Sequence, residues 1–215
     1  GLVRLLQKLK IDQRYLTEDD IGFMIGPRIN AASRMGVPMD AFRLLATTDD
    51  VEAHTFADHL DSINNERKGT VAALVKEVKH LVRERYGDAP DDVIVIGNPE
   101  WKPSLLGLAA NTCAEEYGCP VFLWGRDGDG MIKGSCRAAG TVHLIDLMNA
   151  VPQSSFTQFG GHAESGGFAV SFDLIHSLPE KLSNAYAKIK KESREDTVDV
   201  DVETSFDNVT WDTYR

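Results

Sequence analysis

The stretch Val121–Ala138, VFLWGRDGDGMIKGSCRA, places two apolar runs on either side of a glycine-rich turn. The first run, residues 121–124, is bounded by turn formers and predicts a buried strand. The turn at residues 125–130 then reverses the chain, and residues 131–138 supply the second strand of a hairpin. This part of the chain is therefore expected to contain a sheet.

Further strands and helices surround the hairpin. Residues 93–97 predict another buried strand, and residues 167–172 alternate as a fourth one. Helical segments separate these strands, at residues 104–117, 143–151 and 175–193. The mixture predicts an α/β domain, more exactly described as mixed α+β, over residues 88–194, with a central mixed sheet flanked by helices.

A long helical pattern precedes this domain. Apolar residues recur three, four or seven positions apart from about residue 48 to 86, and Gly87 supplies a C-terminal stop. A helix of that length would span about 57 Å, which is more than one small domain needs to cover its sheet. The pattern predicts a helix that joins two domains. Asn64 and Arg67 fall on or beside its apolar stripe, where an arginine stem commonly packs while the guanidinium reaches water.

The two ends of the chain differ from its middle. Residues 2–10 predict a short amphipathic helix, and Thr17 predicts the N-cap of another, which Gly26-Pro27 should interrupt. Residues 195–212 hold seven acidic and no basic side chains, and their valines alternate with acids as in a strand with one exposed face. We expect this stretch to begin a further domain.

Composition excludes several classes of protein. With 215 residues, 42% of them hydrophobic, the chain can bury a sizeable core. The net charge of −10 argues against a nucleic-acid partner, but most of it lies in residues 195–212, so an anion-binding surface would have to be local. Cys113, Cys119 and Cys136 form no zinc or disulfide pattern, which favours a reduced, cytoplasmic setting. No apolar run approaches the roughly 20 residues of a membrane span.

One motif with binding chemistry is GPRINAASRMG at residues 26–36. The forked guanidinium groups of Arg28 and Arg34 suit bidentate contacts to phosphate, and Asn30 adds a directional amide. The alternative is a helix start that carries surface arginines.

A second motif is KGSCRA at residues 133–138, at the end of a predicted strand. Ser135 and Arg137 supply donors for an anion there, and the glycine allows a close approach to the backbone. The alternative is a strand that finishes in a polar turn.

The third motif, FGGHAESGGF at residues 159–168, brackets a histidine with two glycine pairs. Gly160 and Gly161 could turn their N–H groups toward one anion in a nest. His162 could then bond a phosphate or transfer a proton near neutral pH. The alternative is a histidine with a structural role.

Taken in order along the chain, these three motifs and NNERK at residues 64–68 resemble the RecJ family of single-strand-specific DNA exonucleases, in the DHH phosphoesterase superfamily. The resemblance implies four parts. They are the end of a DHH domain (1–36), a connector that includes the long helix (37–86), a DHH-associated substrate-binding domain (87–194) and the start of an oligonucleotide-binding-fold domain (195–215).

The resemblance also implies an activity, which is metal-dependent 5′→3′ hydrolysis of phosphodiester bonds in single-stranded DNA during repair and recombination. Manganese or magnesium would be held in the full-length protein by Asp and His residues of the DHH domain. No Asp-His-His triplet occurs in this chain. We therefore expect the chain to bind single-stranded DNA, to hold no metal and to be inactive alone. Replication or repair proteins would be further partners.

The same resemblance assigns roles to the motif residues. Arg28, Asn30 and Arg34 would hold phosphates of the strand, and Ser135 and Arg137 would bind a phosphate near the 5′ end. His162, beside Gly160 and Gly161, would contact the scissile phosphate and stabilise its charge in the transition state.

Two alternatives remain open from the sequence. The parent protein could cleave short oligoribonucleotides or cyclic dinucleotides, or it could be a RecJ-like replication scaffold without catalysis.

Overall fold

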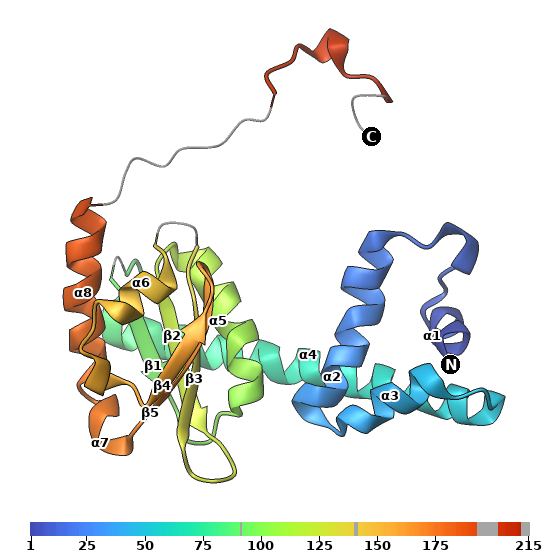
Figure 1. Ribbon diagram of the computed structural model, residues 1–215, viewed down its shortest axis with the longest axis horizontal. Coiled ribbons are helices and arrows are strands. Elements are labelled where there is room, and N and C mark those ends of the chain that lie inside the picture. The colour runs from blue at the N-terminus through green and yellow to red at the C-terminus, as the bar shows by residue number, and fades with distance from the viewer. Residues whose placement is uncertain (91, 140–141, 193–201, 212–215) are drawn as a thin grey trace.

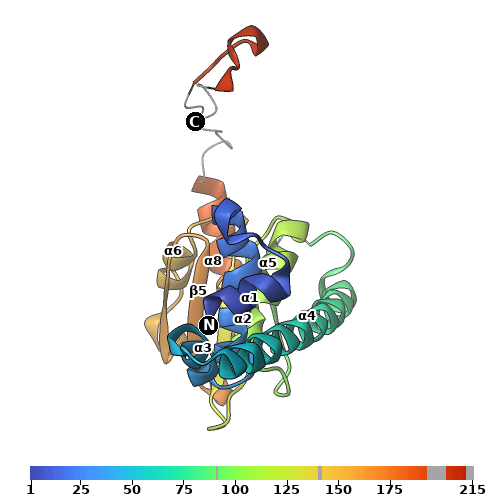
Figure 2. The same ribbon diagram turned by 90° about the vertical axis from the view of Figure 1, so that its right-hand side faces the viewer.

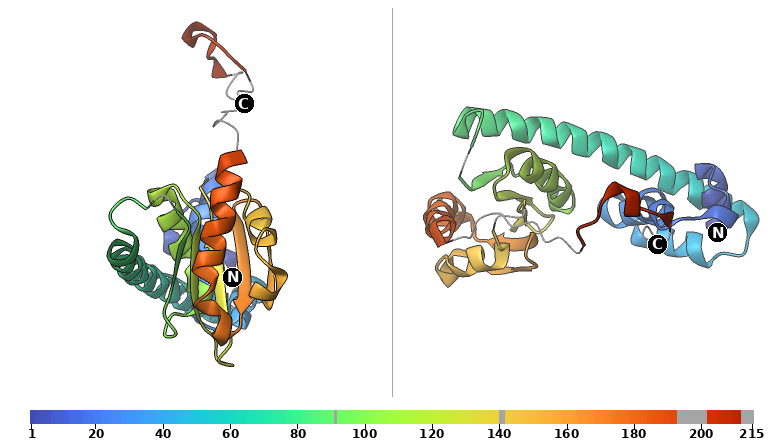
Figure 3. Two further views of the ribbon diagram at one scale, coloured as in Figure 1. Left: turned by 90° about the vertical axis from the view of Figure 1, so that its left-hand side faces the viewer. Right: turned by 90° about the horizontal axis from the view of Figure 1, so that it is seen from above.

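The computed structural model describes residues 1–90, 92–139, 142–192 and 202–211. Helix α4 (Asp50–Tyr86) runs past two groups of elements, a helical part formed by residues 1–46 and a sheet domain that follows it in the chain (Figure 1). Seen from above, α4 is one continuous rod along one side of both groups (Figure 3, right).

The helical part contains α1 (Leu2–Leu9), α2 (Gly26–Met35) and α3 (Pro38–Ala46), which lie against the first half of α4 (Figure 2). The predicted N-cap is confirmed, because the Asp20 N–H donates to Thr17 Oγ1 and the Thr17 N–H donates to Asp20 Oδ2. The expected interruption at Gly26-Pro27 is wrong. A π-helical turn, η2 (Asp20–Ile25), continues directly into α2, and Pro27 occupies its first turn, where a missing N–H costs little.

Helix α4 has 37 residues, so the prediction of one long helix is confirmed. It begins after Asp49, whose side chain accepts from the Glu52 N–H, and ends at Gly87, where φ is +84°. Its buried side chains change partner along its length. Ala57 and Leu60 join the core beneath α1–α3, whereas Leu74, Val78 and Val82 join the core of the sheet domain.

The sheet has five strands in the order β1-β2-β3-β5-β4. They are β1 (Ile94–Gly97), β2 (Val121–Arg126), β3 (Ile132–Arg137), β4 (Gln158–Gly161) and β5 (Ser165–Val170). The β1–β2 pair is parallel and the other pairs are antiparallel, which confirms the mixed α+β class and the β2–β3 hairpin. Strand β4 was not expected from the sequence.

Helices cover both faces of this sheet. Helix α5 (Pro103–Tyr117) and the second half of α4 pack on one face. Helices α6 (Leu144–Asn149), α7 (Phe172–Ile175) and α8 (Leu178–Glu192) belong to the core on the other face. Short 3-10 turns occur at Gln13–Tyr15, Gln153–Ser155 and Phe206–Asn208. Among the described helices, none combines the length and the apolar character that crossing a membrane requires.

Alternation along β3 determines which side chains face α5. Ile132 and Cys136 join the core on the side of α6–α8. Ser135 and Arg137 point to the opposite face, because successive side chains in a strand alternate. The motif that the sequence singled out therefore lies between the sheet and α5.

Tyr86, the last residue of α4, covers the edge strand β1. Its hydroxyl accepts from the Val95 N–H at 2.9 Å and donates to the Val95 carbonyl at 3.2 Å. Burial raises the pKa of the Tyr86 phenol. The Tyr86 hydroxyl thus satisfies both main-chain polar groups of Val95. Without it, these groups would be free to pair with the strand of another molecule.

Candidate functional site

Four arginines come together where the helical part meets the sheet domain: Arg28 and Arg34 on α2, Arg67 on α4 and Arg137 on β3. Partial burial lowers the pKa of Arg67, and the charges of Arg34 and Arg28 lower it further. Burial also lowers the pKa of Arg137, and Arg34 again adds to the decrease. Arg34 is thus electrostatically coupled to arginines on both neighbouring elements, which makes this junction a local centre of positive charge in an acidic chain.

The surroundings of Arg28 differ from those expected of a side chain that holds a phosphate directly. Its side chain is 9% exposed, its Nε donates to Asp61 Oδ1 on α4 at 2.8 Å, and its Nη1 donates to the Met24 carbonyl at 2.7 Å. Two of the three guanidinium nitrogens of Arg28 are thus bonded within the protein, between α2 and α4. The charge of Arg28 still contributes to the field at Arg67.

Arg34 links the two halves of the molecule. Its Nη1 donates to the Ser104 carbonyl at the start of α5, and Ser104 Oγ donates back to the Arg34 carbonyl, each at 2.8 Å. This reciprocal pair fixes the end of α2 against α5. Asn30 lies four residues earlier on α2, where it is exposed.

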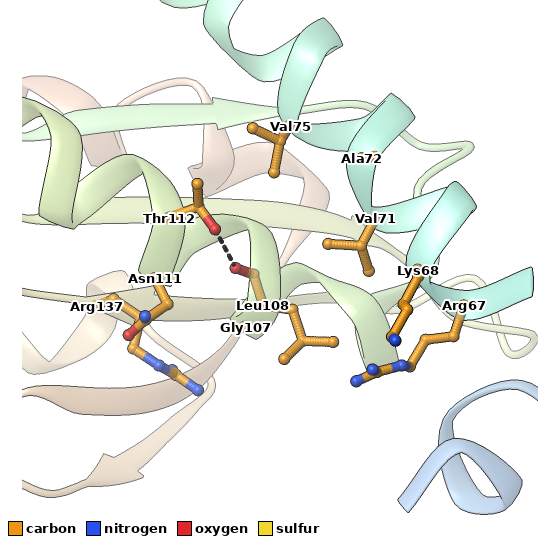
Figure 4. Close-up of a pocket in the computed structure, with 10 residues that line it drawn as sticks. All are labelled: Arg67, Lys68, Val71, Ala72, Val75, Gly107, Leu108, Asn111, Thr112 and Arg137. Atoms are coloured by element: carbon orange, nitrogen blue, oxygen red, sulfur yellow. Dashed lines mark hydrogen bonds between the residues drawn. The ribbon is translucent and has the colours of Figure 1, made fainter. Parts of the chain in front are cut away.

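A cavity of about 660 Å³ opens between α4 and α5. Figure 4 shows Arg67 and Lys68 on α4 at one end and Arg137 on β3 at the other. Aliphatic side chains of both helices line most of the wall between them, together with the polar Asn111 and Thr112, and no carboxylate lines the cavity. The space is therefore cationic at both ends and mainly apolar between them.

Ser135 stands beside a surface of bare glycines. Ser135 pairs with Gly167 on β5, and Gly167 pairs with Gly160 on β4, so the three positions share one face of the sheet. A Cβ placed on Gly160 would meet no heavy atom within 4 Å. The backbone of these strands is consequently open to an approaching ligand.

The expected glycine nest is not formed. Gly160 and Gly161 lie in β4 and pair with β5, so their N–H groups do not converge on one point. Instead they lead to an exposed His162, whose N–H donates to the Ser165 carbonyl at 2.7 Å. Ser165 lies opposite Arg137, so the strand register brings His162 and Arg137 to the same end of the sheet.

Main-chain hydrogen bonds hold the turn that carries His162. The Ala138 N–H donates to the Glu164 carbonyl at 3.1 Å, and the Leu144 N–H donates to the Ala163 carbonyl at 2.7 Å. An exposed side chain on a fixed turn can meet a ligand without first ordering its own backbone.

No metal centre can be built from the described part of the chain, which contains no group of three or more His, Cys, Asp or Glu side chains placed to hold an ion. The chemistry available at this junction is anion binding, with an imidazole at one end.

Comparisons with known proteins agree with this chemistry. Residues 91–195 match the DHHA1 domain. The single-stranded-DNA-specific exonuclease RecJ of Dickeya dadantii is 30% identical over 189 residues, which cover 86% of this chain and 33% of that protein. The chain is similar to RecJ over most of its own length. This similarity agrees with the resemblance inferred from the four motifs.

Solved RecJ structures have the same fold. RecJ from Thermus thermophilus in complex with Mg²⁺ superposes with a TM-score of 0.76 and 28% identity, over 87% of this chain and 28% of that one. The same protein in complex with Mn²⁺ gives a TM-score of 0.75 at 28% identity, over 87% of this chain and 27% of that one. The chain spans about a third of the length of the RecJ relatives that it matches.

The sequence motifs did not reveal every residue of this candidate site. Arg67 and Lys68 belong to NNERK, which supports the family resemblance but was given no binding role, and Arg67 also has a packing explanation. Asn111 carries no sequence signal of its own. The available clue was an arginine on an otherwise apolar stripe. Only the crossing of α4 with α5 shows that it faces a cavity.

Proposed function

We propose that this chain is the substrate-binding part of a RecJ-type nuclease that degrades single-stranded DNA. The observation that carries the proposal is the junction of Arg34, Arg67 and Arg137, where cations from three elements meet beside a cavity without carboxylates. Phosphates of a strand would neutralise this charge, and guanidinium groups suit them geometrically.

In this proposal, the DNA strand crosses the arginine junction toward the end of the sheet that carries His162. Arg34 and Asn30 contact its phosphates from α2. Ser135 and Arg137 hold a phosphate near the 5′ end, and Gly160, which has open space at its Cβ position, leaves room for the DNA. Gly161 lies against the backbone of Ser165 and leads the chain into the turn of His162. His162 contacts the scissile phosphate and stabilises the charge that develops there.

The proposed division of the chain follows the sequence. Residues 1–36 end a DHH domain, residues 37–86 are the connector, residues 87–194 bind substrate, and residues 195–215 begin a further domain. The DHHA1 match over residues 91–195 supports the limits proposed for the third part, residues 87–194. Of the acidic stretch at residues 195–212, residues 195–201 and 212 lie outside the described residues.

Metal ions belong to the whole nuclease in this proposal. The solved relatives hold Mg²⁺ or Mn²⁺, whereas the described residues here do not fit a metal site. These residues bind and orient the strand, and hydrolysis requires the complete protein. The setting is a reduced cytoplasm, supported by Cys113 and Cys136, which are buried free thiols. Replication or repair proteins are proposed as further partners.

Binding of a labelled oligothymidylate to the 215-residue chain tests the proposal. Arg137→Gln should weaken binding about 10- to 100-fold, since hydrogen bonds to a charged group contribute about 1.5–3 kcal/mol. Lys76→Gln is the matched control, because Lys76 is exposed on α4 and does not line the cavity. Equal binding by Arg137→Gln and the native chain would contradict the proposal.

Activity of the complete nuclease tests the role of His162. His162→Ala should lower kcat for a single strand by about 10²- to 10³-fold, as the loss of one transition-state donor does elsewhere. Digestion at the native rate would remove His162 from the reaction.

A further inference from the structure

Two cations near the end of α4 have counter-ions, because Lys79 pairs with Glu116 and Arg83 pairs with Asp88. Arg67 and Lys68, by contrast, have no carboxylate among the residues that line their cavity. The charge of these two residues is therefore not balanced within the cavity.

Arg67 is the cation with the least favourable surroundings there. Its Nε is buried and has no hydrogen-bond partner among the described residues. The charges of Arg34 and Arg28 also repel it, which contributes to the lowered pKa of its guanidinium. A buried donor without a partner and a charge without a counter-ion are both costly. An anion in the cavity would relieve both costs at once.

Gly107 makes the opposite wall of the cavity. A Cβ at this position of α5 would lie 2.8 Å from Arg137 Nη2, so the guanidinium of Arg137 rests directly against the helix. Glycine inside a helix is less favourable than alanine, so its presence here calls for a local reason. A side chain at position 107 would displace the guanidinium of Arg137, which lines the same cavity as Arg67 and Lys68.

We propose that this cavity is a further phosphate subsite for the DNA strand, formed by Arg67 and Lys68 of α4 with Arg137, and that Gly107 is its positioning residue. The inference rests on the proposed function and extends it, because it makes the connector helix part of the substrate-binding surface. The ligand is a backbone phosphodiester, and the aliphatic walls leave space for the attached sugar.

Salt dependence of oligothymidylate binding tests the subsite. Each phosphate contact to a single strand contributes roughly 0.7 to the slope of log affinity against log salt concentration. Arg67→Gln and Lys68→Gln should each reduce the slope by about that amount. Arg67→Lys should retain most of it, and Lys76→Gln should leave it unchanged. Thermal denaturation of each variant checks that it is folded.

The outcomes separate this inference from the proposed function. Native slopes in both Arg67→Gln and Lys68→Gln, together with loss of binding in Arg137→Gln, would overturn the subsite and leave the function standing. Native binding by Arg137→Gln would overturn the function itself.

Gly107→Ala provides a second test, because the helix-position explanation and the Arg137-positioning explanation predict different effects on melting temperature and on binding. If Gly107 only fills a helix position, alanine should raise the melting temperature and leave binding unchanged. If it positions Arg137, binding of the strand should fall at least severalfold without loss of folded structure. Unchanged affinity would remove Gly107 from the proposal.

Discussion

The pair formed by Arg28 and Asp61 provides a decisive test of what Arg28 does. The two side chains are 9% and 19% exposed, and Nε and Oδ1 are 2.8 Å apart. Removing one partner of a buried pair costs about 3–5 kcal/mol. Since Asp61 is partly exposed and Arg28 keeps its bond to the Met24 carbonyl, we expect Asp61→Leu to cost about 3 kcal/mol, near the lower limit.

Thermal and urea denaturation measure this cost. For a chain of this size, about 3 kcal/mol corresponds to a decrease of about 6–12 °C in the melting temperature. The double variant Arg28→Met/Asp61→Leu should recover to within about 1 kcal/mol of the native chain, because no charge then remains buried. Asp58→Leu breaks the exposed pair between Asp58 of α4 and Lys8 of α1 and should lower the melting temperature much less, because solvent screens exposed ion pairs.

The double variant also separates packing from binding. If Arg28 serves the packing of α2 on α4, the stable double variant should bind a single strand within about threefold of the native chain, a difference below about 1 kcal/mol. A tenfold loss of affinity with native stability would refute this reasoning and return Arg28 to the phosphate. A native melting temperature for Asp61→Leu alone would refute the structural role of the pair.

Two further predictions concern stability. Asn64 is fully buried and neither amide atom has a partner among the described residues, so Asn64→Leu should raise the free energy of unfolding in urea by about 1–3 kcal/mol. The exposed neighbour gives the control Asn65→Leu, and a loss of stability in Asn64→Leu would contradict the prediction. The raised pKa of Tyr86 means that the folded state holds the phenol proton more tightly, so stability is complete below the ordinary value of about 10 and falls as pH rises through the folded pKa. Tyr86→Phe should be less stable at neutral pH but should show a smaller alkaline decrease in urea midpoints, because Tyr117 and the buried thiols Cys113 and Cys136 also have raised pKa values. Identical alkaline slopes would rule the assignment out.

Periodicity predicted the elements whose side chains pack in regular rows. Helix α4 and the β2–β3 hairpin follow from apolar spacing and turn residues, because burial on one face imposes that spacing. Strand β4 was missed because Gly160 and Gly161 have low strand propensity, and only pairing with β5 makes them a strand. Gly26-Pro27 was misjudged because a π-helical turn accommodates the proline, which local propensity does not reveal.

The candidate site was predictable only in part for a related reason. Local motifs identified Arg34, Arg137 and His162, because their residue types suggest anion chemistry on their own. They could not show that Arg28 would be paired with Asp61, 33 residues away. Nor could they show that Arg67 would share a cavity with Arg137. Both facts depend on how α2 and α5 cross α4, and crossing geometry is set by packing over the whole interface.

The continuity of α4 has a mechanical consequence. Between Leu60 and Leu74, α4 passes from one core to the other as continuous helix. No loop is present there that could accommodate a change in the angle between the helical part and the sheet domain. Rotating the halves would mean bending the helix and breaking the bonds between Arg34 and Ser104. Helix α4 therefore acts as a stiff spacer that sets the separation of the arginines in advance. In the proposed function, a DNA strand with matching phosphate spacing would therefore bind without the free-energy cost of assembling its binding surface.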